Sequence, residues 1–385
     1  MTTSDFKLWC RYVFTFLCLI LFLNACEEAK KETKGLDEKS IQKHVVSYAK
    51  GFSIAYFDGF KIITIHSAWK GEKNPINYVL YENKKPLNMD GIFIKTPIKS
   101  IACLSLTHIA FLEKLGLQNS IVGLSGCNYV SSPAIKERIN NQFIKEVGQH
   151  EVVNYELLVN MNPEVIMAYG IDQTSATKIN KLKTLGLTTV LNAEYMETHP
   201  LGQAEWIKFI AAFYNEEIKA DSIFDYVEKE YLQLVEIAAK TTNKPTVFTG
   251  MPWSGAWYVP GGLSFQAKLF KDAGATYLWA DNQEERSFVK SKEVILDEAL
   301  DADFWLNVNA YHSIKEIVET DALLKNFKAL KEQQIYNNNL RENAAAGNDY
   351  WESGVVHPHI VLKDLIKIFH PTLIEHQLYY YKKLE

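Results

Sequence analysis

Two short stretches with one shared pattern, NYELLVNMNPEVIM at residues 154–167 and SKEVILDEALDADFWL at residues 291–306, decide the fold. In each, a glutamate stands at the start of a short amphipathic helix, a polar bend follows, and an apolar strand comes next. Helices that alternate with buried strands are typical of α/β proteins with parallel sheets. The repeat therefore predicts two βα lobes built on the same plan.

Each copy is flanked by further elements of the same alternation. Before the first copy, residues 98–106 form a continuous apolar run, as expected of a parallel strand buried on both faces. Thr107 can then cap a helix that ends at Gly116. Each lobe is therefore expected to hold a parallel central sheet. Further strands are expected at 120–124, 146–147, 165–169, 188–191, 246–249 and 304–308, and further helices at 176–185, 265–273, 314–330 and 356–369.

A long helical stretch separates the two lobes. Between residues 202 and 241 apolar side chains such as Ile207 and Ile210 recur at helical spacing, and Asn215 is a candidate break. A helical connector holds two lobes at a nearly fixed angle, which a Gly/Ser-rich linker does not do. The expected architecture is an α/β fold of two βα lobes with parallel central sheets joined by a long rigid α-helix. The expected boundaries are 44–200 for the N-terminal lobe, 201–242 for the connector and 243–385 for the C-terminal lobe.

An N-terminal β-hairpin extension precedes the first lobe. Two apolar runs, 52–57 and 61–65, flank Asp58-Gly59, and an Asp-Gly pair between such runs is a strong hairpin signal. A further strand is expected from Asn77 to Glu82. The extension therefore adds β structure in front of the first lobe.

The first residues carry an export signal. Lys7 and Arg11 precede the apolar run Tyr12 to Leu23, which is shorter than the ~20 apolar residues of a membrane-spanning helix. Leu23-Asn24-Ala25-Cys26 then resembles the lipobox of bacterial lipoproteins, in which the cysteine becomes the lipidated first residue. This predicts a signal peptide at 1–25, lipidation at Cys26, and a charged tether at 26–43 that holds the protein at the periplasmic or extracytoplasmic face of a membrane. The alternative is an ordinary signal peptide or uncleaved anchor in which Cys26 is incidental.

Composition and motifs exclude several classes of function. The chain has a net charge of −5 and no basic tract with interleaved aromatic residues, so we expect no nucleic-acid partner. We expect no enzyme, because Gly-x-Ser-x-Gly, Walker and zinc-protease motifs are absent. The ten histidines are dispersed, which argues against a bare-metal site. Cys103 and Cys127 are expected to be two buried free thiols, with a disulfide as the alternative.

Several motifs taken in order carry a family resemblance. They are Thr107-His108, Gly116, the 147–166 block, Trp257 to Ser264, Asp272 to Ala275, Asn348 to Gly354 and His370-Pro371. Together with the helical connector they resemble the siderophore- and vitamin B12-binding proteins of ABC importers, the helical-backbone class (class III). The resemblance runs from about residue 97 to the C terminus. It implies a monomer without a cofactor, which captures an iron complex or a corrinoid and delivers it to an ABC permease subunit.

The resemblance also implies how the protein docks. In that family one exposed glutamate on each lobe meets arginines of the permease, and by position these are Glu156 and Glu293 here. A carboxylate on each lobe fixes the orientation of docking and speeds encounter. The other explanation is local, because glutamate in the first turn of a helix is favoured by the helix dipole.

The ligand cleft is expected where strands end and helices begin, since ligands of α/β lobes bind there. His108 is the sharpest candidate for contact with a metal or ligand, while a capping role would also account for it. Arg286 could pair with an anionic ligand group, or be a surface charge. His357 and His359, where the family usually has an acidic residue at the second position, are expected at the surface. The candidate ligand-binding residues are His108, Asn128, Tyr129, Trp253, Trp257, Tyr258, Arg286 and Trp351.

Three ligand classes remain open within this resemblance. The aromatic candidates predict a flat apolar wall, which accepts an iron complex of the siderophore type, cobalamin or haem. An iron complex is the preferred expectation. A lipoprotein that binds a protein or a sugar is the alternative from a different class, and the helical connector argues against it because sugar binders often close about a flexible hinge.

Overall fold

The computed structural model describes residues 44–67, 69, 71, 74–149, 152–170, 173–253 and 255–385. The expected signal peptide at 1–25, the tether at 26–43 and Cys26 lie outside the described residues. Across the part of the chain that is described, no helix combines the length and the apolar character that crossing a membrane requires.

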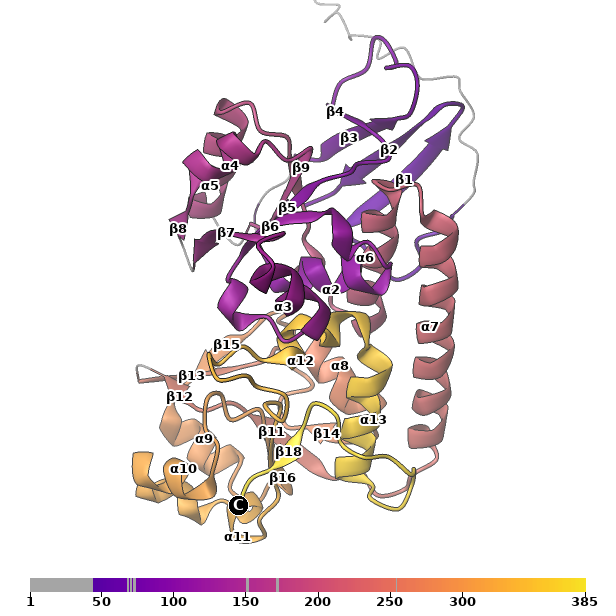
Figure 1. The fold of residues 1–385 in the computed structure, drawn as a ribbon. Coiled ribbons are helices and arrows are strands. Elements are labelled where there is room, and N and C mark those ends of the chain that lie inside the picture. The colour runs from indigo at the N-terminus through magenta and orange to yellow at the C-terminus, as the bar shows by residue number, and fades with distance from the viewer. Residues whose placement is uncertain are drawn as a thin grey trace, which may run out of the picture. The chain divides into compact units, whose positions relative to one another are not determined.

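A four-stranded sheet, ordered β1-β2-β3-β4, forms the N-terminal extension (Figure 1). Its strands are β1 (Phe52–Phe57), β2 (Phe60–Ile65), β3 (Ile76–Tyr81) and β4 (Ile92–Lys95). The predicted hairpin is confirmed: β1 and β2 pair antiparallel up to Phe57 opposite Phe60, across Asp58 and a Gly59 with φ of 80°. Strand β3 pairs antiparallel with β2, and β4 pairs parallel with β3.

The first lobe contains a six-stranded sheet in the order β10-β9-β5-β6-β7-β8, parallel except for the β7–β8 pair. Its strands are β5 (Ile101–Cys103), β6 (Ile121–Ser125), β7 (Lys145–Gln149), β8 (Val152–Val153), β9 (Val165–Ala168) and β10 (Thr189–Leu191). Its helices are α2 (Leu106–Lys114), α3 (Pro133–Asn140), α4 (Tyr155–Met161) and α5 (Gln173–Thr184), with the short 3-10 helices η1 (Gln118–Ser120), η2 (Cys127–Tyr129) and η3 (Glu194–Met196).

Two details of the first lobe differ from the sequence prediction. The apolar run at 98–106 contributes only the three residues of β5, because the chain turns into α2 at Leu106. The helix is capped by Ser105 and not by Thr107: Ser105 has an extended backbone, and its side chain accepts a hydrogen bond from the Thr107 amide.

The second lobe contains a five-stranded sheet in the order β14-β11-β16-β17-β18, with β18 antiparallel. An additional three-stranded antiparallel sheet, β12-β13-β15, was not expected from the sequence. The strands are β11 (Thr246–Thr249), β12 (Pro252–Trp253), β13 (Ala256–Val259), β14 (Thr276–Tyr277), β15 (Phe288–Lys290), β16 (Phe304–Leu306), β17 (Ile335–Asn337) and β18 (Lys382–Lys383).

The helices of the second lobe are shorter than predicted. The expected helix at 314–330 is divided into α10, η4 and α11, because Asp321 adopts an extended backbone and caps η4 with its side chain. The helices are α8 (Phe265–Asp272), α9 (Lys292–Glu298), α10 (Ile314–Thr320), η4 (Ala322–Asn326), α11 (Lys328–Lys331), α12 (Asp349–Glu352), η5 (Gly354–Val356) and α13 (Pro358–Phe369).

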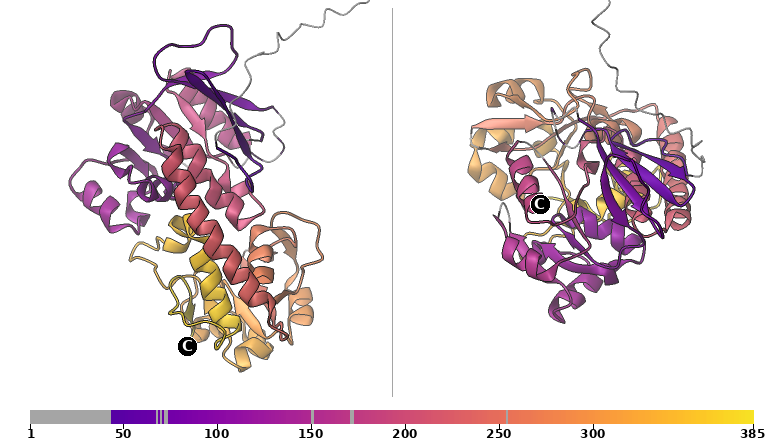
Figure 2. Two further views of the ribbon diagram at one scale, coloured as in Figure 1. Left: turned by 90° about the vertical axis from the view of Figure 1, so that its right-hand side faces the viewer. Right: turned by 90° about the horizontal axis from the view of Figure 1, so that it is seen from above.

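The connector is helical, as predicted, and consists of two helices. Helix α6 (Pro200–Ala212) and helix α7 (Glu217–Ala239) are separated at Asn215, whose φ of 57° ends the first helix. With 23 residues, α7 is about 35 Å long. The left view of Figure 2 shows α7 passing beside both lobes.

Contacts along α7 tie the lobes together. Near its start, Glu217 pairs with Lys61 of β2, and further along Glu230 accepts from Lys363 of α13 at 3.1 Å. Tyr231 donates a hydrogen bond to Asp272 of α8 at 2.7 Å. The helix therefore packs against the extension with its first half and against the second lobe with its second half, which opposes a large change in the angle between the lobes.

Candidate functional site

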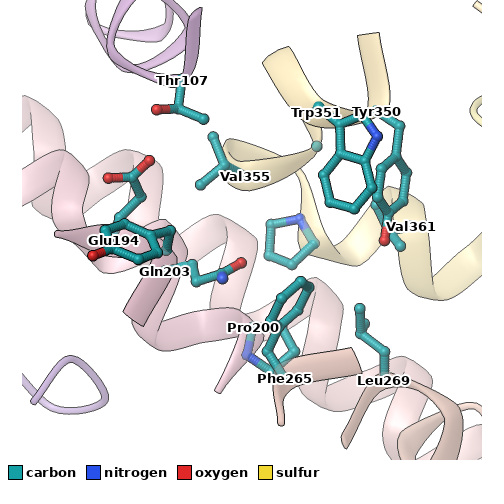
Figure 3. A pocket seen from close by; sticks show the side chains of 13 residues that line it. Thr107, Glu194, Pro200, Gln203, Phe265, Leu269, Tyr350, Trp351, Val355 and Val361 are labelled. Carbon is teal, nitrogen blue, oxygen red and sulfur yellow. The ribbon is translucent and has the colours of Figure 1, made fainter. Parts of the chain in front are cut away.

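Two adjoining hollows of 130 and 510 Å³ lie where the lobes meet, and they share Thr107, Glu194, Tyr195 and Trp351. Figure 3 shows the smaller of the two. We call the two together the cleft. Because the hollows have four lining residues in common, a single ligand can occupy both.

The first lobe supplies the polar side of the cleft. Thr107 follows β5, Ser125 ends β6, and Tyr169 follows β9. Glu194 and Tyr195 come after β10. Since β5, β6, β9 and β10 run parallel, their carboxyl ends meet at one edge of the sheet, and the rule applied to the sequence holds for this lobe.

The second lobe supplies an apolar wall. Its lining side chains come from the faces of helices: Phe265 and Leu269 of α8, Tyr350 and Trp351 of α12, and Val361 of α13 (Figure 3). Among the described residues, none that directly follows β11, β16 or β17 lines the cleft. The wall is therefore made of aromatic and aliphatic groups, which suits a large, largely apolar ligand.

Glu194 is the most unusual polar group of the cleft. Only 4% of the residue is exposed, and its Oε2 has no hydrogen-bond partner among the described residues. Burial raises the pKa of Glu194, opposed by hydrogen bonds from the Thr107 hydroxyl and from the backbone amides of Glu194 and Tyr195. Figure 3 shows the carboxyl directed towards Thr107 and Val355. The carboxyl thus has one oxygen that is buried and has no partner among the described residues.

One predicted ligand residue, Arg286, lies beside this region. The Arg286 guanidinium is 6.0 Å from the ring centroid of Tyr195, so Arg286 reaches a cleft residue from the second lobe. Tyr195 in turn donates its hydroxyl to the Gly170 carbonyl. Arg286 itself is absent from the cleft lining. It is placed to contact a ligand that projects past Tyr195.

The remaining ligand candidates fall into three groups. Tyr129 and Trp351 line the cleft, whereas the neighbouring Asn128 is exposed outside it. Trp253 and Tyr258 are 68% and 49% exposed and lie on one face of the β12-β13-β15 sheet, outside the cleft lining. The structure therefore brings together only part of the predicted aromatic wall.

His108 and Trp257 correct the sequence interpretation. Both are 0% exposed, so neither side chain is accessible to a ligand in this structure. Burial lowers the pKa of His108 to about 3, which keeps its ring neutral. Trp257 donates its indole N–H to the Thr249 carbonyl at 3.0 Å and packs against Trp305. Both are core residues.

The histidine pair at 357 and 359 is also more buried than expected. His359 is 4% exposed, with its ring against Tyr226, and His357 is half-buried with its Nε2 3.1 Å from the Lys114 Nζ. Both lie at the start of α13, where packing between the lobes covers them.

The two cysteines of the described chain are free thiols. Cys103 is buried in β5, and Cys127 is half-buried. Burial raises the pKa of the Cys127 thiol to about 12, with the carboxylate of Glu146 adding to the effect. Within the described ranges, no group of three or more His, Cys, Asp or Glu side chains is arranged to hold a metal ion.

Glu156 and Glu293 occupy corresponding positions in the two lobes. Each lies in the first turn of its helix, α4 or α9, and each is exposed. Neither lines the cleft. A carboxylate that docks to another protein must be exposed and outside the ligand site, and both residues meet this condition.

Sequence analysis missed the pair Glu194 and Tyr195. The strand before them was predicted at 188–191 and is observed as β10 (Thr189–Leu191). The rule that ligands bind where strands end was applied to earlier strands of this lobe. Applied to this strand as well, it would have pointed to both residues.

Comparisons with known proteins agree with this fold. The family model described as periplasmic binding protein matches residues 101–339, which is more than half of the chain. A protein of Methanocaldococcus jannaschii named an uncharacterized lipoprotein is 29% identical over 361 residues, covering 87% of this chain and 84% of its own.

Solved structures share the fold at low identity. A periplasmic haem-binding protein from Pseudomonas aeruginosa is 12% identical with a TM-score of 0.58, covering 75% of this chain and 98% of its own. An ABC-type Fe3+-hydroxamate transport system protein from Saccharomonospora viridis is 16% identical with a TM-score of 0.55, covering 80% and 98%. The description of the matched family agrees with the expected extracytoplasmic location. The two α/β lobes, the helical connector and the matched family model agree, and the chain belongs to the periplasmic binding protein family.

Proposed function

We propose that the protein is the substrate-binding component of an ABC importer, which captures a chelated metal complex of the iron–siderophore type in the cleft and delivers it to the permease. The observation that carries this proposal is the lining of the cleft, with Tyr129, Tyr169 and Tyr195 on one side and Trp351 and Phe265 on the other. Aromatic faces of this kind suit a rigid ligand with a large apolar or aryl surface.

The helical connector supports a mechanism with little rearrangement on binding. Because α7 contacts both lobes along its length, the ligand enters a cleft that is already formed. The loaded protein docks through Glu156 and Glu293, and the permease then separates the lobes. Both carboxylates are exposed in the free protein, so they lose their bound water only when the docking interface forms.

The lipid anchor belongs to the same proposal. Lipidation at Cys26 after removal of residues 1–25 would tether the lobes to the membrane that holds the permease. A relative named a lipoprotein supports this reading. Mass spectrometry of the mature protein tests it: an acylated N-terminal cysteine is expected, and a mature chain that begins elsewhere contradicts it.

The direct test of the function is a tryptophan-fluorescence titration of the purified protein. Because Trp351 lies in the cleft, a bound chromophoric complex should quench its emission. The probes are ferrioxamine B, ferric enterobactin, haemin and cyanocobalamin. Saturable quenching by a ferric siderophore at micromolar concentration or below supports the proposal. Quenching by cyanocobalamin or haemin alone would instead favour the corrinoid or haem alternative, which the same cleft accommodates.

A further inference from the structure

The carboxyl of Glu194 has an oxygen with no hydrogen-bond partner in the described structure, although only 4% of the residue is exposed. Buried polar atoms are almost always paired, and an unpaired one destabilises the folded state. Oε2 is itself covered, but Glu194 lines both hollows of the cleft, and its carboxyl is directed towards Thr107 and Val355, which also line it (Figure 3). A group that enters the cleft can therefore supply the missing partner.

The surroundings of Glu194 define the chemistry of that partner. Burial, the Thr107 hydroxyl and two backbone amides shift the pKa of Glu194, and no cation contributes to that shift. Across the cleft stand Trp351 and Val355, which offer no hydrogen-bonding side-chain group except the indole N–H. None of these groups around the Glu194 carboxyl carries the positive charge that an anionic ligand group would need at this point of the cleft.

We propose that Glu194, with Thr107 beside it, is a ligand-recognition site that accepts a hydrogen bond from an amide N–H at the edge of the bound complex. This inference rests on the proposed function and narrows its ligand class to chelates that carry amide groups. Ferric hydroxamates with peptide-like linkages and corrinoids with carboxamide side chains share this chemistry. Haem presents propionates, and a carboxylate placed beside a buried carboxyl is repelled or must bind a proton.

The energetic argument favours strong discrimination. A buried site built to form a hydrogen bond rejects a ligand that lacks the matching group, because the site's own polar atom is then left unpaired. The hydrogen bond from Thr107 restrains the carboxyl before the ligand arrives. Glu194 therefore selects among ligands of similar size that the aromatic walls alone would accept equally.

The test compares the substitutions Glu194→Met and Thr107→Val with Glu319→Met in the full chain. Glu319 is an exposed carboxylate of α10, so Glu319→Met removes the same charge outside the cleft. Fluorescence titrations use cyanocobalamin, ferrioxamine B and haemin. We expect Glu194→Met to weaken binding of the amide-bearing probe that the wild type prefers by 10-fold or more, with a smaller loss for Thr107→Val. Binding of haemin should stay within 2-fold or improve, and Glu319→Met should stay within 2-fold for every probe. Cyanocobalamin and ferrioxamine B distinguish the corrinoid from the hydroxamate source of the amide.

A second measurement separates this inference from the proposed function. Urea denaturation of the ligand-free protein checks that the variants are folded: Glu194→Met leaves the Thr107 hydroxyl and two backbone amides without their acceptor and should lose some stability, whereas Glu194→Gln keeps an acceptor and should be closer to the wild type. Unchanged affinity of folded Glu194→Met for an amide-bearing probe that the wild type binds would overturn the inference and leave the proposed function standing. If no probe binds the wild type, the proposed function itself fails.

Discussion

The two lobes share a plan but present their strand ends differently. In the first lobe the carboxyl ends of β5, β6, β9 and β10 open into the cleft. In the second lobe the corresponding ends are closed by the protein itself. Trp305 donates its indole N–H to the Gly250 carbonyl at 2.8 Å, and Asn337 donates to the Asn309 and Tyr311 carbonyls at 2.8 and 2.9 Å. A repeated secondary-structure pattern therefore does not imply a repeated binding site.

The difference has a packing cause. Phe248, Trp257, Trp305 and Phe327 form a buried aromatic cluster in the second lobe, and the β12-β13-β15 sheet lies over it. Within this cluster Trp257 and Trp305 donate their indole N–H groups to the Thr249 and Gly250 carbonyls, so the backbone acceptors at the end of β11 are already paired. The second lobe consequently contributes helix faces, mainly those of α8 and α12, to the cleft.

The largest expected effect concerns the one feature that the lobes do share, the exposed glutamate. Replacing both, Glu156→Lys with Glu293→Lys, should abolish ligand uptake in cells because repulsion replaces attraction at both docking points. Affinity for the ligand should be unchanged, since neither residue lines the cleft. Uptake of a labelled ferric siderophore and fluorescence titration measure the two quantities. An equal fall in affinity and uptake would refute the docking role, and the single variants would show whether the lobes contribute equally.

The closed end of the second lobe should matter for stability and hardly at all for binding. Trp305 is 0% exposed, so Trp305→Ala should lower the free energy of unfolding by about 3–5 kcal/mol through lost burial and a cavity. Urea denaturation measures this loss. Tyr195→Ala, at the open end of the first lobe, is the matched variant: its loss of stability should be smaller and its loss of affinity larger. A larger loss of stability for Tyr195→Ala than for Trp305→Ala, or a larger loss of affinity for Trp305→Ala, would contradict this comparison of the lobes.

The contact between the lobes predicts a pH dependence. Glu352 of α12 accepts hydrogen bonds from the Ser131 and Ser132 amides of the first lobe at 2.6 and 3.0 Å. Burial raises the pKa of Glu352 from 4.5 to about 7. The folded protein therefore holds this proton more tightly than the unfolded chain. Its contribution to stability is complete below about pH 4.5 and is lost as the pH rises through about 7.

Glu352→Gln removes this titration and keeps an acceptor for one amide. Between pH 4.5 and 8, the wild type should lose about 3 kcal/mol of stability relative to the variant. Denaturation curves of both proteins at several pH values give the difference directly. A difference that does not change with pH would show that the Glu352 carboxyl titrates normally.

The smallest expected effects distinguish aromatic residues inside the cleft from those outside it. Trp351→Ala should weaken ligand binding by about 10-fold through loss of a stacking surface. Trp253→Ala should change affinity by less than 2-fold and stability by no more than about 0.5 kcal/mol, because Trp253 is 68% exposed and outside the cleft lining. A large effect of Trp253→Ala on affinity would mean that the ligand extends onto the β12-β13-β15 sheet.

Local sequence patterns predicted much of the fold because they act locally. The Asp58-Gly59 turn, the helical spacing of the connector and the two copies of the glutamate-led helix each specify structure within a few residues. The strand-end rule then located Tyr129 in the cleft, although at the end of the first strand it selected His108, which is buried. The pairing of β13 with β15 escaped prediction because it joins residues about 30 positions apart, for which no local signal exists.

What the sequence by itself determined was the order of elements and the short segments that reach the cleft. Only the tertiary structure decided which of two adjacent residues faces the ligand. Thr107 lines the cleft while His108 enters the core, because neighbouring residues of a helix point about 100° apart. Tyr258 is exposed while Trp257 is buried, because successive side chains of a strand point to opposite faces. Which face becomes the inside depends on what packs against it, and that is a property of the whole fold.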